Sequence, residues 1–472
     1  MKPRRKPSLL EAFIPVLGLG LFLVLALYAF NLEPHIPLVF GCVIAAMMAL
    51  RLGYDWTDIR LSILQSVYRA VESIVIIHIV GMLIGTWISS GTIPAMVYYG
   101  LDLIEPKIFL VTGCIICAIV SFATGSSWTS SGTVGVALMG IASGLNINPA
   151  LAAGMVISGA YFGDKLSPFS DSSNVAAATA ETNLYSHVGS MVYTTLPSFC
   201  ISLMIYAIVG LQSVYGEFDS TRVELIQNAL INQFNIKPIV MIPAIFIFLA
   251  AIKKIHPIPS LFFGALLGGI WSIIFQNRSL EDVFLVLHFG YQSHTGIKVV
   301  DTLLTRGGFH SMMWTISLII FALAFGGIME KAKLTEVLLE GIIRKVKSIP
   351  GLIGTTIFTS ILSDFILTDQ YLSIIVPGRA YAFLYDQMHL DRRVLSRTLE
   401  DGATLWSPLC PWNGCGAYQA ATLGVATFSY LPFAFFNLIN PFLAIFMAYI
   451  GWGLFYNKNI LEEVIEKEGL DL

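Results

Sequence analysis

The feature that most constrains this chain is a series of long apolar blocks without charged residues, such as residues 13–30 and 238–252. A helix needs about 20 mainly apolar residues to cross the hydrocarbon core of a bilayer. Only 12% of the 472 residues are Asp, Glu, Lys or Arg, about half the proportion found in soluble domains. Too few polar side chains remain to solvate a water-facing surface, so we predict an all-α polytopic membrane protein.

Several other classes of protein are excluded by the same patterns. The strands of a membrane β-barrel alternate apolar and polar residues, whereas these blocks are continuous. A nucleic-acid binder would need a basic surface. Cys114 and Cys117 lie in an apolar segment without the hydrophilic partners of a metal site, so we interpret them as packing residues. The chain has neither a phosphate-binding loop nor a His-Glu-x-x-His motif, so we expect no cofactor and no enzymatic activity.

Positive charge sets the expected orientation. The N-terminal tip is basic and precedes an apolar run longer than that of a signal peptide. Basic connections tend to stay in the cytoplasm, so we place there the N-terminus and the connections at 253–254, 344–347 and 392–397. The long polar connection that ends at Lys237 leans acidic and is predicted to be external. This path through the membrane gives about 12 spans.

The chain is predicted to divide into two membrane halves. We expect a first half over 1–212, an external connecting loop over 213–237, a second half over 238–456 and a cytoplasmic tail over 457–472. Each half contains a Ser-Pro pair that interrupts an apolar region, at Ser167 and at Ser407. The connection before the second pair is basic, whereas residues 145–148 contain no Lys or Arg. The same element thus enters from opposite sides, which predicts two inverted-topology repeats with broken helices.

The breaks are expected around 164–174, 363–370 and 404–416, where polar residues interrupt apolar runs. Non-helical backbone at membrane depth survives only against protein or a wet cavity. Its carbonyls, with neighbouring hydroxyls, are oxygen ligands suited to Na⁺. A carboxylate at that depth costs at least about 2.5 kcal/mol, and a bound cation can compete there with a proton. The predicted ion-binding residues are Asp171, Ser167, Asn174, Asp369, Asp364, Ser407 and Asn413. Among them, Na⁺ is assigned to Asp171, Ser167, Asn174 and Ser407.

Three further acids are candidates for a proton pathway, namely Asp164, Glu400 and Asp401. Each acid has a simpler alternative, and Asp171 is the acid that such an alternative fits least well. Asp364 and Asp369 would also fit a short outer loop, and Asp164 would also fit an ion pair with Lys165 or a place at the cytoplasmic mouth. Glu400 and Asp401 would also fit an interfacial network with the arginines before them. Asp171 is therefore the first choice for the site.

The motifs around these acids resemble those of the NhaC family of sodium/proton antiporters. The resemblance rests on Gly-Asp-Lys-Leu-Ser-Pro-Phe-Ser-Asp-Ser-Ser-Asn at 163–174, on Arg-Thr-Leu-Glu-Asp at 397–401, on Ser-Pro-Leu-Cys-Pro-Trp-Asn at 407–413 and on Cys-Gly-Ala-Tyr at 415–418. It implies a multi-pass exchanger of the prokaryotic inner membrane with inverted repeats, and family analogy suggests a homodimer. The expected activity is exchange of Na⁺ for H⁺ by alternating access, without nucleic acid as a partner.

The same family includes exchangers of small organic acids. Some members resemble malate/lactate exchangers that couple Na⁺ and H⁺, and others have amino acids as assigned substrates. The alternative function is therefore Na⁺/H⁺-coupled exchange of an organic acid or amino acid. Such a protein would hold the organic anion with half-helix N-termini, or with cations such as Arg379 and Lys165.

Overall fold

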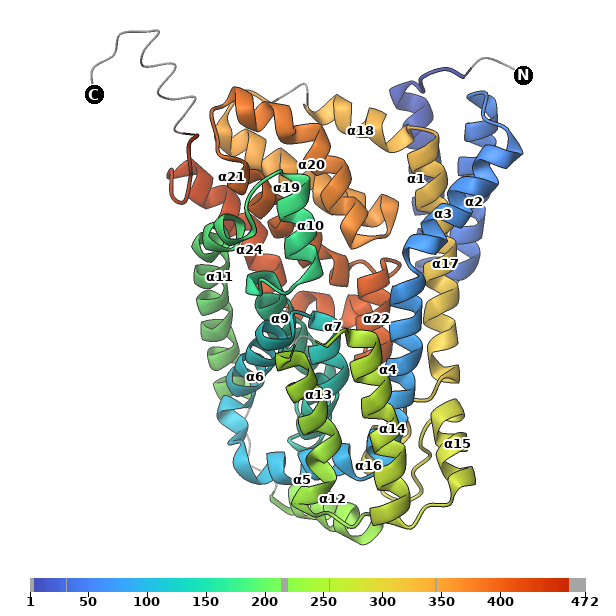
Figure 1. Ribbon diagram of the computed structural model, residues 1–472, viewed down its shortest axis with the longest axis vertical. Helices are drawn as coiled ribbons and strands as arrows, with labels where there is room; N and C mark the ends of the chain where they lie inside the picture. The colour runs from blue at the N-terminus through green and yellow to red at the C-terminus, as the bar shows by residue number, and fades with distance from the viewer. Residues whose placement is uncertain (1–3, 31, 214–219, 254, 344–345, 458–472) are drawn as a thin grey trace.

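A computed structural model describes residues 4–30, 32–213, 220–253, 255–343 and 346–457. Within these ranges the chain consists of α-helices joined by short π and 3-10 segments, and no β-strand occurs in them (Figure 1). The prediction of an all-α protein is confirmed. The proposed tail from residue 458 onward, residues 214–219 of the connecting loop, and Lys254, Arg344 and Lys345 lie outside the described residues.

The helices of the first half precede residue 214. They are α1 (Leu9–Val24), α2 (His35–Arg51), α3 (Trp56–Arg69), α4 (Val71–Ser89), α5 (Thr92–Leu103), α6 (Phe109–Thr124), α7 (Ser127–Ser130), α8 (Val136–Gly144), α9 (Pro149–Leu166), α10 (Asp171–Thr179) and α11 (Leu184–Ser213). Two π-helices belong to this half, η1 (Leu25–Ala29) after α1 and η3 (Ser131–Gly135) between α7 and α8.

The remaining helices follow residue 219. They are α12 (Ser220–Gln233), α13 (Ile242–Ile252), α14 (Pro257–Gln276), α15 (Leu280–Phe289), α16 (Lys298–Leu304), α17 (Met313–Lys331), α18 (Leu334–Ile343), α19 (Ile349–Leu367), α20 (Gln370–Gln387), α21 (Arg392–Leu399), α22 (Gly414–Leu423), α23 (Thr427–Tyr430) and α24 (Phe435–Tyr449). A π-helix, η6 (Glu400–Thr404), and a 3-10 helix, η7 (Ser407–Leu409), follow α21.

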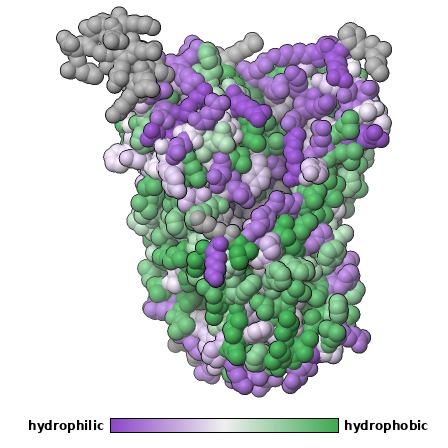
Figure 2. Space-filling view, in the orientation of Figure 1, coloured by the Kyte–Doolittle hydropathy of each residue, from purple (hydrophilic) through white to green (hydrophobic). Residues whose placement is uncertain are grey.

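The exterior and the helix lengths suit a bilayer. In the described chain, seven helices are long and apolar enough to cross a membrane, and the number rises to nine if two sharply bent helix pairs each count as one span. Large apolar side chains point outward from these helices, and apolar residues cover much of the side of the molecule (Figure 2). Hydrophilic residues gather at its upper rim in that view. The chain is therefore a multi-pass membrane protein.

Two helical hairpins have left-handed residues at their tips. Helix α6 ends at Gly125, whose φ is +68°, and α7 follows two residues later. Helix α19 ends at Thr368, whose φ is +59°, and α20 begins after Asp369. A left-handed residue terminates an α-helix and lets the chain reverse. Both tips are buried, since Gly125 and Thr368 are almost inaccessible to solvent.

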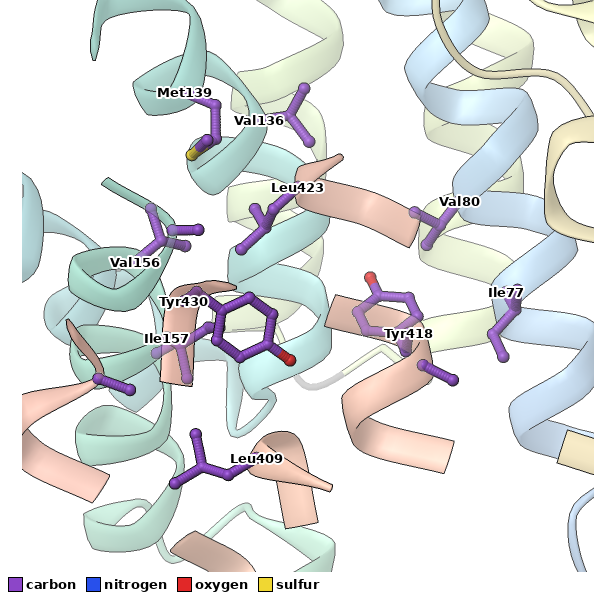
Figure 3. Packing of buried hydrophobic residues seen from close by; sticks show 14 of the residues in the cluster. Ile77, Val80, Val136, Met139, Val156, Ile157, Leu409, Tyr418, Leu423 and Tyr430 are labelled. Carbon is purple, nitrogen blue, oxygen red and sulfur yellow. The ribbon is translucent and has the colours of Figure 1, made fainter. Parts of the chain in front are cut away.

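Two further elements are interrupted rather than reversed. Between α9 and α10 the chain is non-helical over residues 167–170, and Pro168 within this stretch lacks the N–H that would continue the helix. Between η7 and α22 the chain is non-helical over residues 410–413. Half-helix α22 packs on α4, α17 and η3. Its residues Tyr418 and Leu423 lie between Val80 and Val156 in the view of Figure 3.

Candidate functional site

The hairpin tips and the interrupted helices meet at a cavity of about 100 Å³. Since one water molecule needs roughly 10–15 Å³ of such space, the cavity has room for several waters or a partly hydrated cation. Four helices present their N-terminal ends to it, namely α7, α10, α20 and α22. The lining residues at these ends are Ser126, Ser127, Ser170, Asp171, Ser172, Thr368, Asp369, Gln370, Asn413, Gly414 and Cys415.

The first half supplies two carboxylates to the cavity. Asp171 is the first residue of α10 and its side chain is exposed there. Asp164 lies in the last turn of α9 and is only 7% exposed. Its Oδ2 accepts a hydrogen bond of 2.6 Å from the Ser127 hydroxyl, which joins α9 to the tip of the first hairpin. The two acids thus lie on either side of the break between α9 and α10.

The second half supplies a carboxylate and a carboxamide. Asp369 caps α20, where its Oδ1 accepts a hydrogen bond of 2.8 Å from the Leu372 amide. Asn413 caps α22 in the same way, accepting from the Cys415 amide at 3.0 Å. The Asn413 amide nitrogen also donates to Asp364 Oδ1 at 3.2 Å. Asp364 is fully buried behind the cavity wall, and its Oδ2 has no hydrogen-bond partner in the described chain.

A buried ion pair lies next to the cavity and joins the two halves. Lys165 of α9 pairs with Asp401 of η6, and neither side chain is accessible to solvent. Asp401 Oδ1 also accepts hydrogen bonds from Thr194 at 3.1 Å and from Asn440 at 2.6 Å. The adjacent Glu400 is fully buried, and neither of its carboxylate oxygens has a hydrogen-bond partner among the described residues.

Only part of the predicted ion-binding set lines the cavity. Asp171, Asp369 and Asn413 do, together with Asp164 from the predicted proton pathway. The other four predicted ligands, Ser167, Asn174, Asp364 and Ser407, do not. Two of these side chains donate hydrogen bonds to backbone carbonyls. The Ser167 hydroxyl donates to the Phe122 carbonyl at 2.8 Å, and the Asn174 amide nitrogen donates to the Ser170 carbonyl at 2.8 Å. The Ser407 hydroxyl lies within hydrogen-bond distance of the Thr404 carbonyl, at 3.0 Å, and of Gln370 Oε1, at 3.3 Å.

The structure also resolves the alternatives for the acids. Asp364 lies within α19 rather than in an outer loop, and Asp369 lies at the tip of an internal hairpin. Lys165 pairs with Asp401 and not with Asp164. Arg397 donates to the Gly453 carbonyl at 2.7 Å rather than to Asp401 or Glu400, so the expected network of these acids with the preceding arginines is not formed. Arg379, a candidate for binding an organic anion, is exposed and does not line the cavity.

Several lining residues were missed from the sequence. They are mainly the hydroxyl residues of the hairpin tips, Ser126, Ser127 and Thr368, and they are joined by Glu72 of α4. Glu72 Oε1 lies 3.0 Å from His256 Nε2, and both of these side chains are largely exposed. For the first tip, the sequence contains a polar stretch over 124–133 that interrupts an apolar region. In the described chain no three His, Cys, Asp or Glu side chains are placed to hold one metal ion, so a cation here would also need neutral oxygen ligands.

Comparison with known proteins finds a family model and several relatives that match this chain. A model of the Na⁺/H⁺ antiporter family matches residues 159–452. The chain is 38% identical over 460 residues to the malate-2H⁺/Na⁺-lactate antiporter of Bacillus subtilis strain 168, across 97% of this chain and 98% of the relative. It is also 38% identical to the Na⁺/H⁺ antiporter NhaC of Alkalihalophilus pseudofirmus, across 92% and 93% of the two chains.

A third relative is named for a different pair of substrates. The arginine/ornithine antiporter of Halobacterium salinarum is 34% identical over 456 residues, across 96% of this chain and 94% of the relative. Together, the match over more than half of the chain and the nearly full-length relatives show that this protein belongs to the Na⁺/H⁺ antiporter family.

Proposed function

We propose that this protein is a secondary active transporter that exchanges Na⁺ for H⁺ by alternating access. The observation that carries the proposal is that carboxylates from both halves face one small cavity at broken helices, namely Asp164, Asp171 and Asp369. Na⁺ would be held by Asp171 and Asp369 together with hydroxyl and amide oxygens at the helix ends. Protonation of the same carboxylates removes the charge that holds the cation, so one site alternately carries Na⁺ and H⁺.

Protons would reach this site through the acids of α9 and η6. Asp164 lines the cavity and directly precedes Lys165, which pairs with Asp401. Glu400 lies beside that pair without a hydrogen-bond partner among the described residues. Glu400 is therefore the acid of this group without a fixed partner, whereas Asp401 is held by Lys165.

We also propose that the two halves, 1–212 and 238–456, are repeats related by a constant offset. The starts of three pairs of helices lie 243 residues apart, for α7 and α20 at Ser127 and Gln370, for α9 and α21 at Pro149 and Arg392, and for α10 and α22 at Asp171 and Gly414. Left-handed residues recur at the same interval, in the pairs Gly125 and Thr368, Asn146 and His389, and Glu181 and Gly424. Agreement at six places supports a duplicated fold.

Reciprocal packing supports a two-fold relation between the halves. Helix α10 packs on α20, and its counterpart α22 packs on η3 and α8, which lie at the positions equivalent to α20. The first turn of α21 carries Arg392 and Arg393, whereas neither residues 145–148 nor the first turn of α9 contains Lys or Arg. Since basic connections stay inside, the two equivalent connections would lie on opposite sides.

This arrangement accounts for about 12 membrane elements. Each half would contribute two apolar helices, one long element through α4 or α17, one hairpin that enters from one side, one broken helix and one closing span. The connecting segment over 213–237, which contains α12, would be external, and the N-terminus and the tail from residue 457 would be cytoplasmic. The bacterial origin of the relatives supports the further proposal that this protein lies in the cell membrane of a prokaryote.

The direct test uses purified protein in liposomes. Vesicles loaded with NaCl and a pH-sensitive dye are diluted into Na⁺-free buffer that contains no organic solute. Outward movement of Na⁺ should drive protons inward and acidify the lumen, and protein-free vesicles give the leak. If the lumen does not acidify under any imposed Na⁺ gradient, simple Na⁺/H⁺ exchange is not the activity.

One observation favours a second candidate, exchange of a small organic acid or amino acid coupled to Na⁺ and H⁺. Four helix N-termini point at the cavity, and each carries a partial positive charge that stabilises a carboxylate. Two of the relatives carry organic substrates in their names. In the same vesicles, acidification that begins only when malate, lactate or an amino acid is added would select this candidate and make Na⁺ a coupling ion.

A further inference from the structure

A narrow apolar cleft of about 270 Å³ lies between α1 and α19, with α17 at its back. Its walls include Leu19, Gly20 and Leu23 of α1, Phe325 of α17 and Phe365 of α19, and Trp412 at the break before α22. The indole N–H of Trp412 donates to the Phe365 carbonyl at 3.0 Å, so even this polar atom is satisfied. The cleft thus offers only apolar contacts.

The local sequence explains why the cleft is open. Helix α1 packs on α2 and α18, whereas α19 packs on α17, so the facing sides of α1 and α19 are left apart. Gly20 presents no side chain to the gap, and a Cβ built at this position would have no atom within 4 Å. An unfilled space of this kind forfeits the dispersion contacts of its walls, and water does not fill apolar cavities.

The mouth of the cleft faces lipid. Leu17, Leu21 and Val24 of α1 are 66%, 59% and 56% exposed, and Phe358 of α19 is 56% exposed. Helices α1, α17 and α19 are all long and apolar enough to span a membrane, so the cleft lies at the depth of the hydrocarbon. The apolar molecules that are abundant at this depth are the acyl chains of lipids.

We propose that the cleft between α1 and α19 binds one acyl chain of a bilayer lipid. The bound chain contacts Trp412, and the next residue, Asn413, caps α22 and holds Asp364. The lipid therefore packs against the segment that forms one wall of the central cavity. This binding site is separate from the exchange activity, and its occupancy does not depend on which substrate the cavity carries.

The test is photo-labelling in proteoliposomes that contain a phospholipid with a diazirine in its acyl chain. Mass spectrometry of the digested protein should find lipid adducts on the cleft residues, including Phe365 and Trp412. Gly20→Phe fills the cleft with a side chain and should lower labelling of these two residues about tenfold, the effect of losing contacts equal to roughly two buried methylene groups. Gly20→Leu, a smaller change, should give an intermediate reduction.

The matched control is Gly189→Phe, which adds the same side chain at an exposed glycine of α11 that also has open space around it. It should leave the labelling of Phe365 and Trp412 unchanged. Labelling in the wild-type protein that reaches Leu17 and Leu21 but not Phe365 or Trp412 would show that lipid stays outside the cleft. A photoreactive residue at Val24 that forms a covalent dimer instead of a lipid adduct would assign the cleft to a second copy of the chain and overturn the proposal.

Discussion

Asp171 combines the two properties that a transported cation requires, a carboxylate and access to the cavity. It begins α10 directly after the break, and its side chain is exposed in the cavity rather than engaged in an ion pair. We expect Asp171→Asn to abolish Na⁺-driven proton flux while the protein still inserts and purifies normally, because the carboxamide has nearly the same shape without the charge. Asp282→Asn, which changes an acid on α15 away from the cavity, is the control and should retain flux. Wild-type flux in Asp171→Asn would remove this residue from the mechanism.

The ion pair between Lys165 and Asp401 should matter for stability as well as for transport. Removal of one member of a buried pair leaves an uncompensated charge and costs about 3–5 kcal/mol, whereas removal of both costs much less. Lys165→Met should therefore lower the midpoint of thermal unfolding in detergent strongly, and Lys165→Met with Asp401→Asn should recover most of the loss. If the double variant is no more stable than Lys165→Met alone, the pair does not act as a unit.

At the scale of the elements, the hairpin tips depend on residues that tolerate left-handed backbone. Gly125 has a φ of +68°, and a Cβ there would lie 2.7 Å from the backbone of Phe169 in the neighbouring break. Gly125→Ala combines an unfavourable conformation of about 1 kcal/mol with this clash, so it should lower the unfolding midpoint. Gly414→Ala, at the start of α22 with open space around it, should leave the midpoint unchanged or raise it slightly. Equal effects of the two substitutions would contradict this role of the tip.

The helix ends also show how much of the fold could be predicted from the sequence. Breaks were predicted around 164–174, 363–370 and 404–416, and helices end close to each of these ranges, because proline, charge and hydroxyl residues are costly in a buried helix. If the two Ser-Pro motifs are aligned with each other, the two halves fall three residues out of register with the alignment that the helix starts give. Pro168 lies in a break, but Pro408 occupies the first turn of η7, where a proline is tolerated, and the break follows it at 410–413.

The acids of the site could be predicted from the sequence, but its hydroxyl residues could not. Asp164, Asp171 and Asp369 were identified because an acid in an apolar context requires a partner or a role. Ser127 and Thr368 were not, because a hydroxyl in an apolar helix usually bonds back to its own backbone. Four helix ends meet at one cavity because of tertiary packing. No local pattern in the sequence predicts this packing.

For the whole molecule, the proposed inversion makes a prediction about two turns that the repeat relates. Asn146 precedes α9 and His389 precedes α21, with φ values of +57° and +56°. If one half is inverted, these equivalent turns lie on opposite sides of the membrane, with Asn146 outside and His389 in the cytoplasm. A parallel duplication would instead place both turns on the same side of the membrane. The sides on which Asn146 and His389 lie therefore distinguish the two architectures.

Cysteine accessibility in intact cells measures this difference. Asn146→Cys should react with a membrane-impermeant maleimide, whereas His389→Cys should react only after the cells are permeabilised, and the parent chain with its six cysteines gives the background. Lys347→Cys, in a basic connection, should behave like His389→Cys, and Glu224→Cys on α12 should behave like Asn146→Cys. Labelling of both turn positions from the outside would rule out the inverted repeat. It would also remove the symmetry on which alternating access between two equivalent cavity walls depends.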